Sequence, residues 1–397
     1  MRTLGVLFAA LVIAACSQPG AAPVRTPKPS LSPPAAGATP TTGQRYAVMV
    51  HTAGTGEPYY VQLVGPDGRG GPWARGITRT SKTLFISTPC PKGAICHDSE
   101  SAPYSMPEVS VSRTRVYYLD GDTQIMGMDT AGTVSPIKNI GAPPNSQVMF
   151  SVSPDDSRVA VSIATLATSR RAVGSFDDRM YVEDLFDGSH HVDLYQSTRI
   201  AEWPIGWHGA DLIAAVGTSN LATYDNPYGA VGYRVVDPGT GTVLSSLDCW
   251  RGLVVAAGTA CSTGLCESTT ICKPGTLETQ AWNGAKAAFP LPPGPGQGVF
   301  VPYVCLSPLG DRMAVQLVTD PEAGTVETAA IQNGAVLYRT LTGAPEGWLD
   351  DDHLVVADAD EVSIVDVASG LSVPMTALQR IPNQGTPRFI GTLPPSL

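Results

Sequence analysis

Beyond residue 44 the chain runs in short apolar stretches, rich in Val, Ile and Tyr, that are separated by Gly, Pro and Asp-Gly turns. Within these stretches β-branched and aromatic residues tend to alternate with other residues. A period of two is typical of half-buried strands, whereas an amphipathic helix repeats its apolar positions every three to four residues. No stretch of normal helix length with helical periodicity follows residue 44. The pattern therefore predicts an all-β domain over residues 45–397.

Internal repetition strengthens this prediction. The segments 115–132 and 353–370 are both 18 residues long and align without a gap. Each has an apolar strand, an Asp-x-Asp turn, a second apolar strand and then an Asp followed by a Gly, so that Asp120 falls on Asp358. Asp and Gly suit such turns because they tolerate positive φ and satisfy local backbone groups. The unit reads as strand, tight hairpin, strand and second turn.

The second turn of this unit recurs along the chain. Its seven copies are at 65–68, 129–132, 187–188, 237–241, 274–275, 333–334 and 366–370. The intervals between the copies vary, so we expect several connections to carry insertions. A unit that recurs every few tens of residues is typical of propellers and related arrays, in which one unit alone cannot bury both of its faces.

A further marker precedes the hairpins. The segment 151–161 contains Ser-Val-Ser-Pro-Asp-Asp-Ser-Arg and matches 305–315, while 206–213 matches 347–355 less closely. These segments resemble the strand–Ser-Pro-Asp-Gly–strand signature of TolB-like and WD-repeat-like β-propeller blades. The resemblance implies four-stranded antiparallel blades around a central channel. It also implies protein partners in the cell envelope, although nothing in this chain matches the separate N-terminal domain of the TolB family.

We therefore expect seven blades, with a ring of six or eight blades and two stacked β-sandwiches as alternatives. The expected blade starts are near Tyr46, Glu108, Val148, Ile205, Leu253, Val301 and Gly347. After the seventh blade, the apolar run Arg388–Leu393 remains. We predict that this run joins the first blade beside residues 46–51, because pairing there removes an exposed strand edge.

The N-terminus has the pattern of an export signal. Arg2 precedes an apolar run from Leu4 to Ala15, and Cys16 follows two small residues. The run is shorter than the roughly 20 residues that span a bilayer, and it suits a signal peptide over residues 1–15. The segment resembles the lipobox of bacterial lipoproteins, which implies that Cys16 becomes the first mature residue and is acylated. The alternative is an ordinary signal peptide with a chance cysteine.

Residues 16–44 read as a lipidated cysteine and a disordered tether. Residues 17–44 contain seven prolines but no aromatic or acidic residue, and they cannot bury enough apolar area to fold. The net charge of −10 excludes nucleic acid, which demands clustered Lys and Arg, as the partner. We expect membrane lipid to hold the protein through acylated Cys16, with a monomeric domain on the extracytoplasmic face of the cell membrane.

The eight cysteines fit an oxidising compartment. If Cys16 is acylated, the natural disulfide pairs by spacing are Cys90 with Cys96 and Cys261 with Cys266. The remaining cysteines, among which the sequence does not choose a third bridge, are Cys249, Cys272 and Cys305. A zinc site at Cys90, Cys96 and His97 is the weaker alternative, because the segment lacks a second pair of ligands at zinc-finger spacing.

No strong catalytic motif is present, and we predict no cofactor and no metal. His190-His191 reads as a solvated loop, because it follows the turn at 187–188. The acidic turns, such as 350–352, offer oxygen ligands of the kind that calcium takes, but turn chemistry alone explains Asp at these positions. Trp207 and Trp348 occupy matching positions and are expected to pack between blades.

These observations favour a binding or scaffolding module that recognises an envelope protein or a small ligand through the propeller loops. The segment 81–107 is the first candidate for a partner-binding loop, since long loops on a rigid scaffold commonly carry function. The alternative is an extracytoplasmic propeller enzyme, a hydrolase or lyase, with catalytic residues at one mouth of the channel. A cluster of His, Asp, Glu or Arg at that mouth would favour the enzyme.

Overall fold

The described residues of the computed structural model belong to the compact unit Ala36–Leu397. They are residues 45–395 without 52, 55, 79–103, 106–107, 145, 167–175, 218–231, 248–253, 256–257, 262–270, 273–275, 293–297, 321–324, 342, 359–360, 377 and 379–386. Within these residues the structure contains strands and turns but no helix, as the sequence predicted. This part of the chain accordingly has no helix that could cross a membrane.

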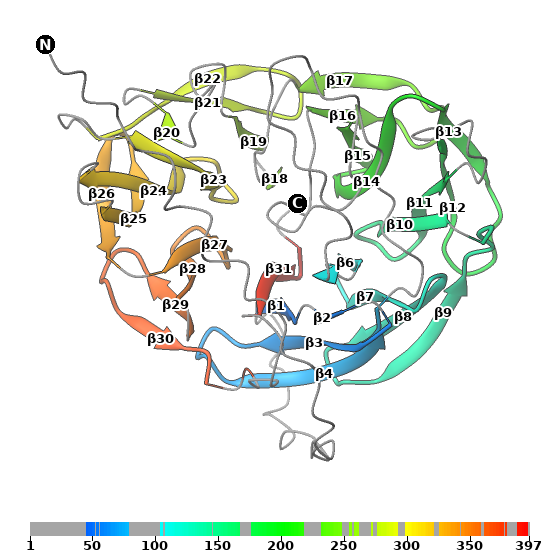
Figure 1. Cartoon of the computed structure of the whole chain (residues 1–397), viewed down its shortest axis with the longest axis horizontal. Helices are drawn as coiled ribbons and strands as arrows, with labels where there is room; N and C mark the ends of the chain where they lie inside the picture. Colours follow the sequence, from blue (N-terminus) through cyan, green and yellow to red (C-terminus); the bar gives the residue numbers. More distant parts are fainter. Residues whose placement is uncertain are drawn as a thin grey trace, which may run out of the picture. The chain divides into compact units, whose positions relative to one another are not determined.

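The strands form seven antiparallel blades arranged around a common centre (Figure 1), six with four strands and one with five. From the inner to the outer edge, blade 1 consists of β31 (Arg388–Leu393), β1 (Tyr46–Val50), β3 (Pro58–Val64) and β4 (Gly70–Ile77). Blade 2 consists of β6 (Val109–Val111), β7 (Arg115–Asp120), β8 (Gln124–Asp129) and β9 (Val134–Asn139). Blade 3 consists of β10 (Ser146–Val152), β11 (Arg158–Leu166), β12 (Phe176–Asp184) and β13 (Val192–Ser197).

The remaining blades follow the same order, except that blade 6 has a short extra strand, β20, which pairs with the beginning of β23. Blade 4 consists of β14 (Ala201–His208), β15 (Asp211–Gly217), β16 (Gly232–Val236) and β17 (Val243–Leu247). Blade 5 consists of β18 (Val254–Val255), β19 (Gly258–Cys261), β21 (Thr276–Gln280) and β22 (Lys286–Pro290). Blade 6 consists of β20 (Ile271–Cys272), β23 (Gly298–Leu306), β24 (Arg312–Asp320), β25 (Thr325–Gln332) and β26 (Ala335–Thr340). Blade 7 consists of β27 (Ala344–Trp348), β28 (His353–Ala357), β29 (Val362–Asp366) and β30 (Ser372–Pro374).

The blade starts confirm the prediction from the repeat. Apart from the short extra strand β20 of blade 6, the first strands of the blades along the chain begin at Tyr46, Val109, Ser146, Ala201, Val254, Gly298 and Ala344, each within a few residues of the expected start. An additional two-stranded ribbon pairs β2 (Ala53–Gly54) with β5 (Tyr104–Ser105).

Apolar clusters between neighbouring blades form the core. Each of the seven junctions between successive blades has its own buried cluster. Between blades 1 and 2, for example, Val48 and Val61 pack with Val116, and all three side chains are fully buried. Burial of one such side chain contributes roughly 1.5–3 kcal/mol. Since every blade needs a neighbour on both faces, the closed ring is the unit that folds.

The C-terminal strand closes the ring. β31 pairs antiparallel with β1, with Tyr46 opposite Leu393 and Val50 opposite Arg388. It forms the inner strand of blade 1 and contacts the inner strands β27 and β6 of the two neighbouring blades. The predicted pairing of the C-terminal run with the first blade is therefore confirmed, and the structure adds that the run takes the innermost position (Figure 1).

Two tryptophans at matching repeat positions pack between neighbouring blades and are hydrogen-bonded across the junction. Trp207 on β14 and Trp348 on β27 have 2% and 3% of their surface exposed. The Nε1 atom of Trp207 donates a hydrogen bond to the Ser151 carbonyl of the preceding blade at 3.4 Å. The Nε1 atom of Trp348 donates in the same way to the Cys305 carbonyl at 3.1 Å. The expectation that the two residues pack between blades is confirmed.

One predicted turn was wrong. In blade 5 the outer hairpin turns at residues 281–285, where the Ala281 amide donates to the Ala285 carbonyl at 2.9 Å, and not at 274–275. Gly284 takes a φ of 84°, which side chains other than glycine rarely adopt. The repeat pattern misled here because the connection from β19 to β21 contains the extra strand β20, which pairs with β23 of blade 6.

Candidate functional site

The connections between strands divide the propeller into two faces. Because the strands are antiparallel, the first-to-second and third-to-fourth strand connections of each blade lie at one face, which we call the turn face. The second-to-third strand connections and those between blades lie at the other face, which we call the loop face. The longest connections of the chain join strand ends at the loop face; they link β4 to β5, β11 to β12, β15 to β16, β19 to β21 and β30 to β31.

A cavity of about 530 Å³ lies on blade 3 toward the loop face. Its floor comes from neighbouring strands in register, because Ile163 on β11 is opposite Arg179 on β12, which is opposite Gln196 on β13. The next row toward the loop face contains Thr165 opposite Asp177. Side chains in register on neighbouring strands point to the same side of a sheet, so these five residues form one mixed polar and apolar surface.

The opposite wall of the cavity includes Pro143, from the connection between β9 and β10. This connection begins with Ile140, which is buried between blades 2 and 3, and continues as Gly141-Ala142-Pro143-Pro144 with small or rigid side chains. A Cβ atom placed on Gly141 would have no other atom within 4 Å, so the space beside it is open. Ile140 and Ala142 pack in the cluster between blades 2 and 3, and Pro143 of the same connection lines the cavity.

The carboxylates of the cavity already have partners. Gln196 Nε2 donates to Asp177 Oδ1 at 3.3 Å. Asp193, which also lines the cavity, has its Oδ1 at 3.2 Å from His191 Nε2. In contrast, the Arg179 guanidinium makes no hydrogen bond or ion pair with any residue that the structure describes, and this side chain is exposed. The cavity thus presents one uncommitted cation.

A buried acidic pair lies on the other side of β12, between blades 3 and 4. Asp178 is completely buried and accepts hydrogen bonds from the Ser162 hydroxyl and the Glu202 amide, both at 2.8 Å. Glu202 is 2% exposed and forms an ion pair with Arg234. Burial raises the pKa of Asp178 to about 6 and that of Glu202 to about 7, because removing a carboxylate from water disfavours its charged form.

Glu346 on β27 and Arg388 on β31 form a second buried pair, this time on the inner strands. Arg388 Nε donates to Glu346 Oε2 at 2.9 Å, and burial raises the pKa of Glu346. The side chain of Glu346 is only 6% exposed. Both buried pairs therefore bridge neighbouring blades, and their carboxylates are not accessible to a substrate as general acids or bases would have to be.

Most of the predicted site residues lie outside the described residues. These are Cys16, Cys90, Cys96, His97, Cys249 and Cys266, together with most of the segment 81–107. Cys261 ends β19 and Cys272 ends β20, but the described part of the structure does not include their side chains. Lipidation of Cys16 and the two expected disulfides accordingly remain predictions.

Cys305 is the exception among the predicted cysteines. It carries a free thiol that is completely buried between blades 6 and 7, so it does not form the third bridge that the sequence left open. Burial raises the pKa of this thiol, with a further contribution from the nearby Glu346 carboxylate. A thiol in this setting stays protonated and unreactive.

The two adjacent histidines are exposed and each has an acidic partner. His190 Nδ1 lies 2.7 Å from Asp184 Oδ2, and His191 Nδ1 lies 3.0 Å from Glu183 Oε2. Glu183 also forms an ion pair with Lys138 of blade 2 at 2.9 Å. Hydrogen bonds to these carboxylates raise the pKa values of both histidines. The pair follows the outer turn of blade 3 as predicted.

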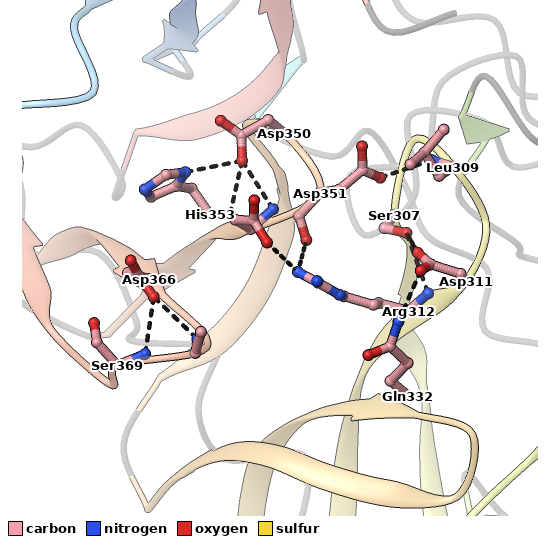
Figure 2. Close-up of polar contacts among 12 residues, drawn as sticks. Ser307, Leu309, Asp311, Arg312, Gln332, Asp350, Asp351, His353, Asp366 and Ser369 are labelled. Carbon is pink, nitrogen blue, oxygen red and sulfur yellow. Dashed lines mark hydrogen bonds and ion pairs between the residues drawn. The ribbon is translucent and has the colours of Figure 1, made fainter.

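The acidic turns of blades 6 and 7 use their carboxylates for structure (Figure 2). Asp350 accepts hydrogen bonds from the backbone amides of Asp352 and His353. Asp351 accepts from the Leu309 amide of blade 6 at 2.8 Å, and Arg312 Nη1 donates to Asp352 Oδ1 at 2.6 Å. The described residues include no group of three or more side chains that could hold a metal ion.

Sequence reasoning missed the residues of the cavity and both buried pairs. A signal for one of them exists in β12, where Asp178, Met180 and Val182 share a side of the strand and are all buried. An acidic residue in phase with buried apolar positions is unusual, because a buried charge is costly unless it is paired. The strand pattern alone could therefore have identified Asp178 as a buried acid.

No family model matches the sequence, and no curated protein matches it. Among solved structures, the uncharacterized protein lmo1340 from Listeria monocytogenes EGD-e has a TM-score of 0.43 at 9% identity, with 68% of this chain and 82% of that chain covered. A putative TolB from Agrobacterium tumefaciens has a TM-score of 0.32 at 12% identity, with 83% and 88% covered. A puromycin-hydrolyzing peptidase from Mycobacterium tuberculosis has a TM-score of 0.41 at 15% identity, with 85% of this chain and 55% of the peptidase covered.

Proposed function

We propose that the chain is a lipid-anchored, extracytoplasmic β-propeller that binds an envelope protein or a small ligand with its loop face. In this proposal acylated Cys16 holds the protein at the membrane, and residues 17–44 act as the tether. The blades are a rigid scaffold, and recognition needs no bond chemistry.

The observation that carries the binding proposal is the asymmetry between the two faces. At the turn face, short turns are closed by their own Asp side chains, as where Asp366 accepts from the amides of Ala368 and Ser369 (Figure 2). At the loop face, the strand ends that are joined by the longest connections lie on the same side of the ring as the blade 3 cavity. Binding residues are commonly found on loops that a rigid scaffold positions.

The anchor and the binding face are tested separately. For the anchor, a Cys16→Ala variant should move from the membrane fraction to the soluble fraction and should lose labelling by an alkyne-bearing fatty acid. A Cys305→Ala variant is the control, because its buried thiol is not accessible to an acyl donor. Equal membrane retention and labelling of the parent and Cys16→Ala would refute the anchor.

For the binding face, a photo-crosslinking amino acid is placed at exposed apolar positions on each side of the ring. Leu341 (69% exposed) and Ile200 (38% exposed) lie in loop-face connections, whereas Leu309 (73% exposed) and Leu371 (69% exposed) lie in turns of the turn face. Irradiation of intact cells should give adducts from the loop-face positions at several times the yield of the turn-face positions. Equal yields, or adducts from the turn face alone, would contradict the proposal.

A further inference from the structure

We propose that the cavity on blade 3 binds the carboxylate of a small organic acid or of a peptide C-terminus, with Arg179 as the partner of that carboxylate. The inference rests on the proposed function, because it names the ligand chemistry that one part of the loop face would take.

Of the charged residues that line the cavity, Arg179 is the one available to bind an anion. The carboxylates of Asp177 and Asp193 already accept hydrogen bonds, from Gln196 and His191 respectively. Hydrogen bonds to Glu183 and Asp193 raise the pKa of His191, which favours the imidazolium form that compensates Asp193. Arg179 has no such partner among the described residues, so the guanidinium is the charged group that remains available to a ligand.

The planar guanidinium of Arg179 suits a planar oxyanion such as a carboxylate. Arginine presents its N–H donors as a rigid fork, which matches the two oxygens of a carboxylate. Thr165 and Gln196 also line the floor of the cavity, but the Thr165 hydroxyl is hydrogen-bonded to Ser146 at 2.7 Å and the Gln196 amide donates to Asp177, so the contact with the carboxylate falls to Arg179.

The apolar residues of the lining favour a ligand with an aliphatic group next to its carboxylate. Ile163 and Pro143 contribute apolar surface beside Arg179. A cavity of about 530 Å³ is in the range of small-molecule sites and accommodates an amino-acid or dipeptide unit. A charged carboxylate next to an aliphatic side chain therefore fits both parts of the lining.

The test uses a matched pair of probes on the full-length protein. N-acetyl-leucine carries a free carboxylate, and N-acetyl-leucinamide is the same molecule with that group replaced by a neutral amide. Titration calorimetry should detect saturable binding of the acid at least about 10-fold tighter than that of the amide, since hydrogen bonds to a charged group are the stronger kind. Equal affinities, or no binding of either probe and of the peptide described below, would overturn the proposal.

Two arginine variants locate the site. Arg179→Gln should weaken binding of the acid at least about 10-fold, as expected for loss of a charge-assisted contact. Arg199→Gln makes the same chemical change at another exposed loop-face arginine that does not line the cavity, and it should bind as the parent does. Both residues are exposed, so equal melting temperatures will confirm that both variants fold. Unchanged binding by Arg179→Gln would contradict the assignment.

A pentapeptide ending in leucine, with a free or an amidated C-terminus, distinguishes the two sources of the carboxylate. Preference for the free peptide over N-acetyl-leucine supports a polypeptide ligand, whereas preference for N-acetyl-leucine supports a free organic acid. If none of these probes binds while the loop-face crosslinks persist, the carboxylate inference fails and the proposed function stands. If the crosslinks also vanish, both fail.

Discussion

At the scale of single residues, two buried tryptophans differ in the hydrogen bonding of the indole N–H. Trp348 Nε1 donates to the Cys305 carbonyl at 3.1 Å, whereas Trp203 Nε1 is buried with no partner among the described residues. A buried donor without an acceptor is desolvated but makes no replacement hydrogen bond, which lowers the free energy of unfolding by about 1–3 kcal/mol. The two positions therefore allow the hydrogen bond to be separated from the packing of the ring.

We predict that Trp348→Phe lowers the free energy of unfolding by about 1–2 kcal/mol more than Trp203→Phe does. Both changes remove a similar volume from the core, but only the first leaves a carbonyl without its donor. Urea unfolding of the two variants and the parent measures the difference. Equal losses would mean that the hydrogen bond between blades 6 and 7 contributes nothing.

The buried acids make the stability depend on pH. The pKa of Glu202 is about 7 in the folded chain, against an ordinary value of 4.5, and that of Asp178 is about 6 against 3.8. The folded chain therefore binds more protons than the unfolded chain between about pH 4 and 7. By linkage, these two groups lower the free energy of unfolding as the pH rises through that window.

We predict that Glu202→Gln weakens this dependence, because a neutral amide does not titrate. Between pH 5 and pH 8 the parent should lose stability from these groups on the order of 1–3 kcal/mol, and the variant should lose markedly less. Urea midpoints at the two pH values provide the measurement. Glu327→Gln is the control for the chemical change, because Glu327 forms a partly exposed ion pair with Arg339, away from the buried acidic pair.

At the scale of elements, the sequence predicted the strands that belong to matching repeat segments. The hairpin of β28 and β29 could be predicted from its match to β7 and β8, and the pairing of β31 followed from the need to cover a strand edge. The turn at 281–285 could not be predicted, because the insertion that contains β20 displaces the third strand of blade 5 from the expected spacing.

Deletion of residues 386–397 should lower the melting temperature by at least about 10 °C, or prevent folding. The deletion removes β31, so β1 is left with a free edge and the contacts of β31 with β27 and β6 are lost. A shorter deletion, of residues 395–397, keeps the whole strand and should melt as the parent does. Where the longer deletion still folds, a peptide spanning 386–397 should raise its melting temperature, and an unchanged value on deletion would refute the closure.

At the scale of the whole molecule, the ring could be predicted from the sequence but the cavity could not. Repeats mark what each blade has in common, whereas the cavity depends on where the connection between β9 and β10 places Pro143 relative to the strands of blade 3. Its floor also depends on which face of β12 carries Arg179, and that depends on the register with β11. No local motif records either fact.

The closed ring also determines how the molecule unfolds. Each junction between blades has its own buried cluster, so opening any one of them exposes apolar surface on two blades and weakens the next. We therefore predict a single cooperative transition, in which tryptophan fluorescence and far-UV circular dichroism give the same urea midpoint.

Residues 45–397 expressed alone should melt within about 2 °C of the full chain, because the core clusters lie within that range. Two separated transitions would indicate that some blades fold independently, and a much lower melting temperature of the shortened chain would mean that residues before 45 stabilise the ring.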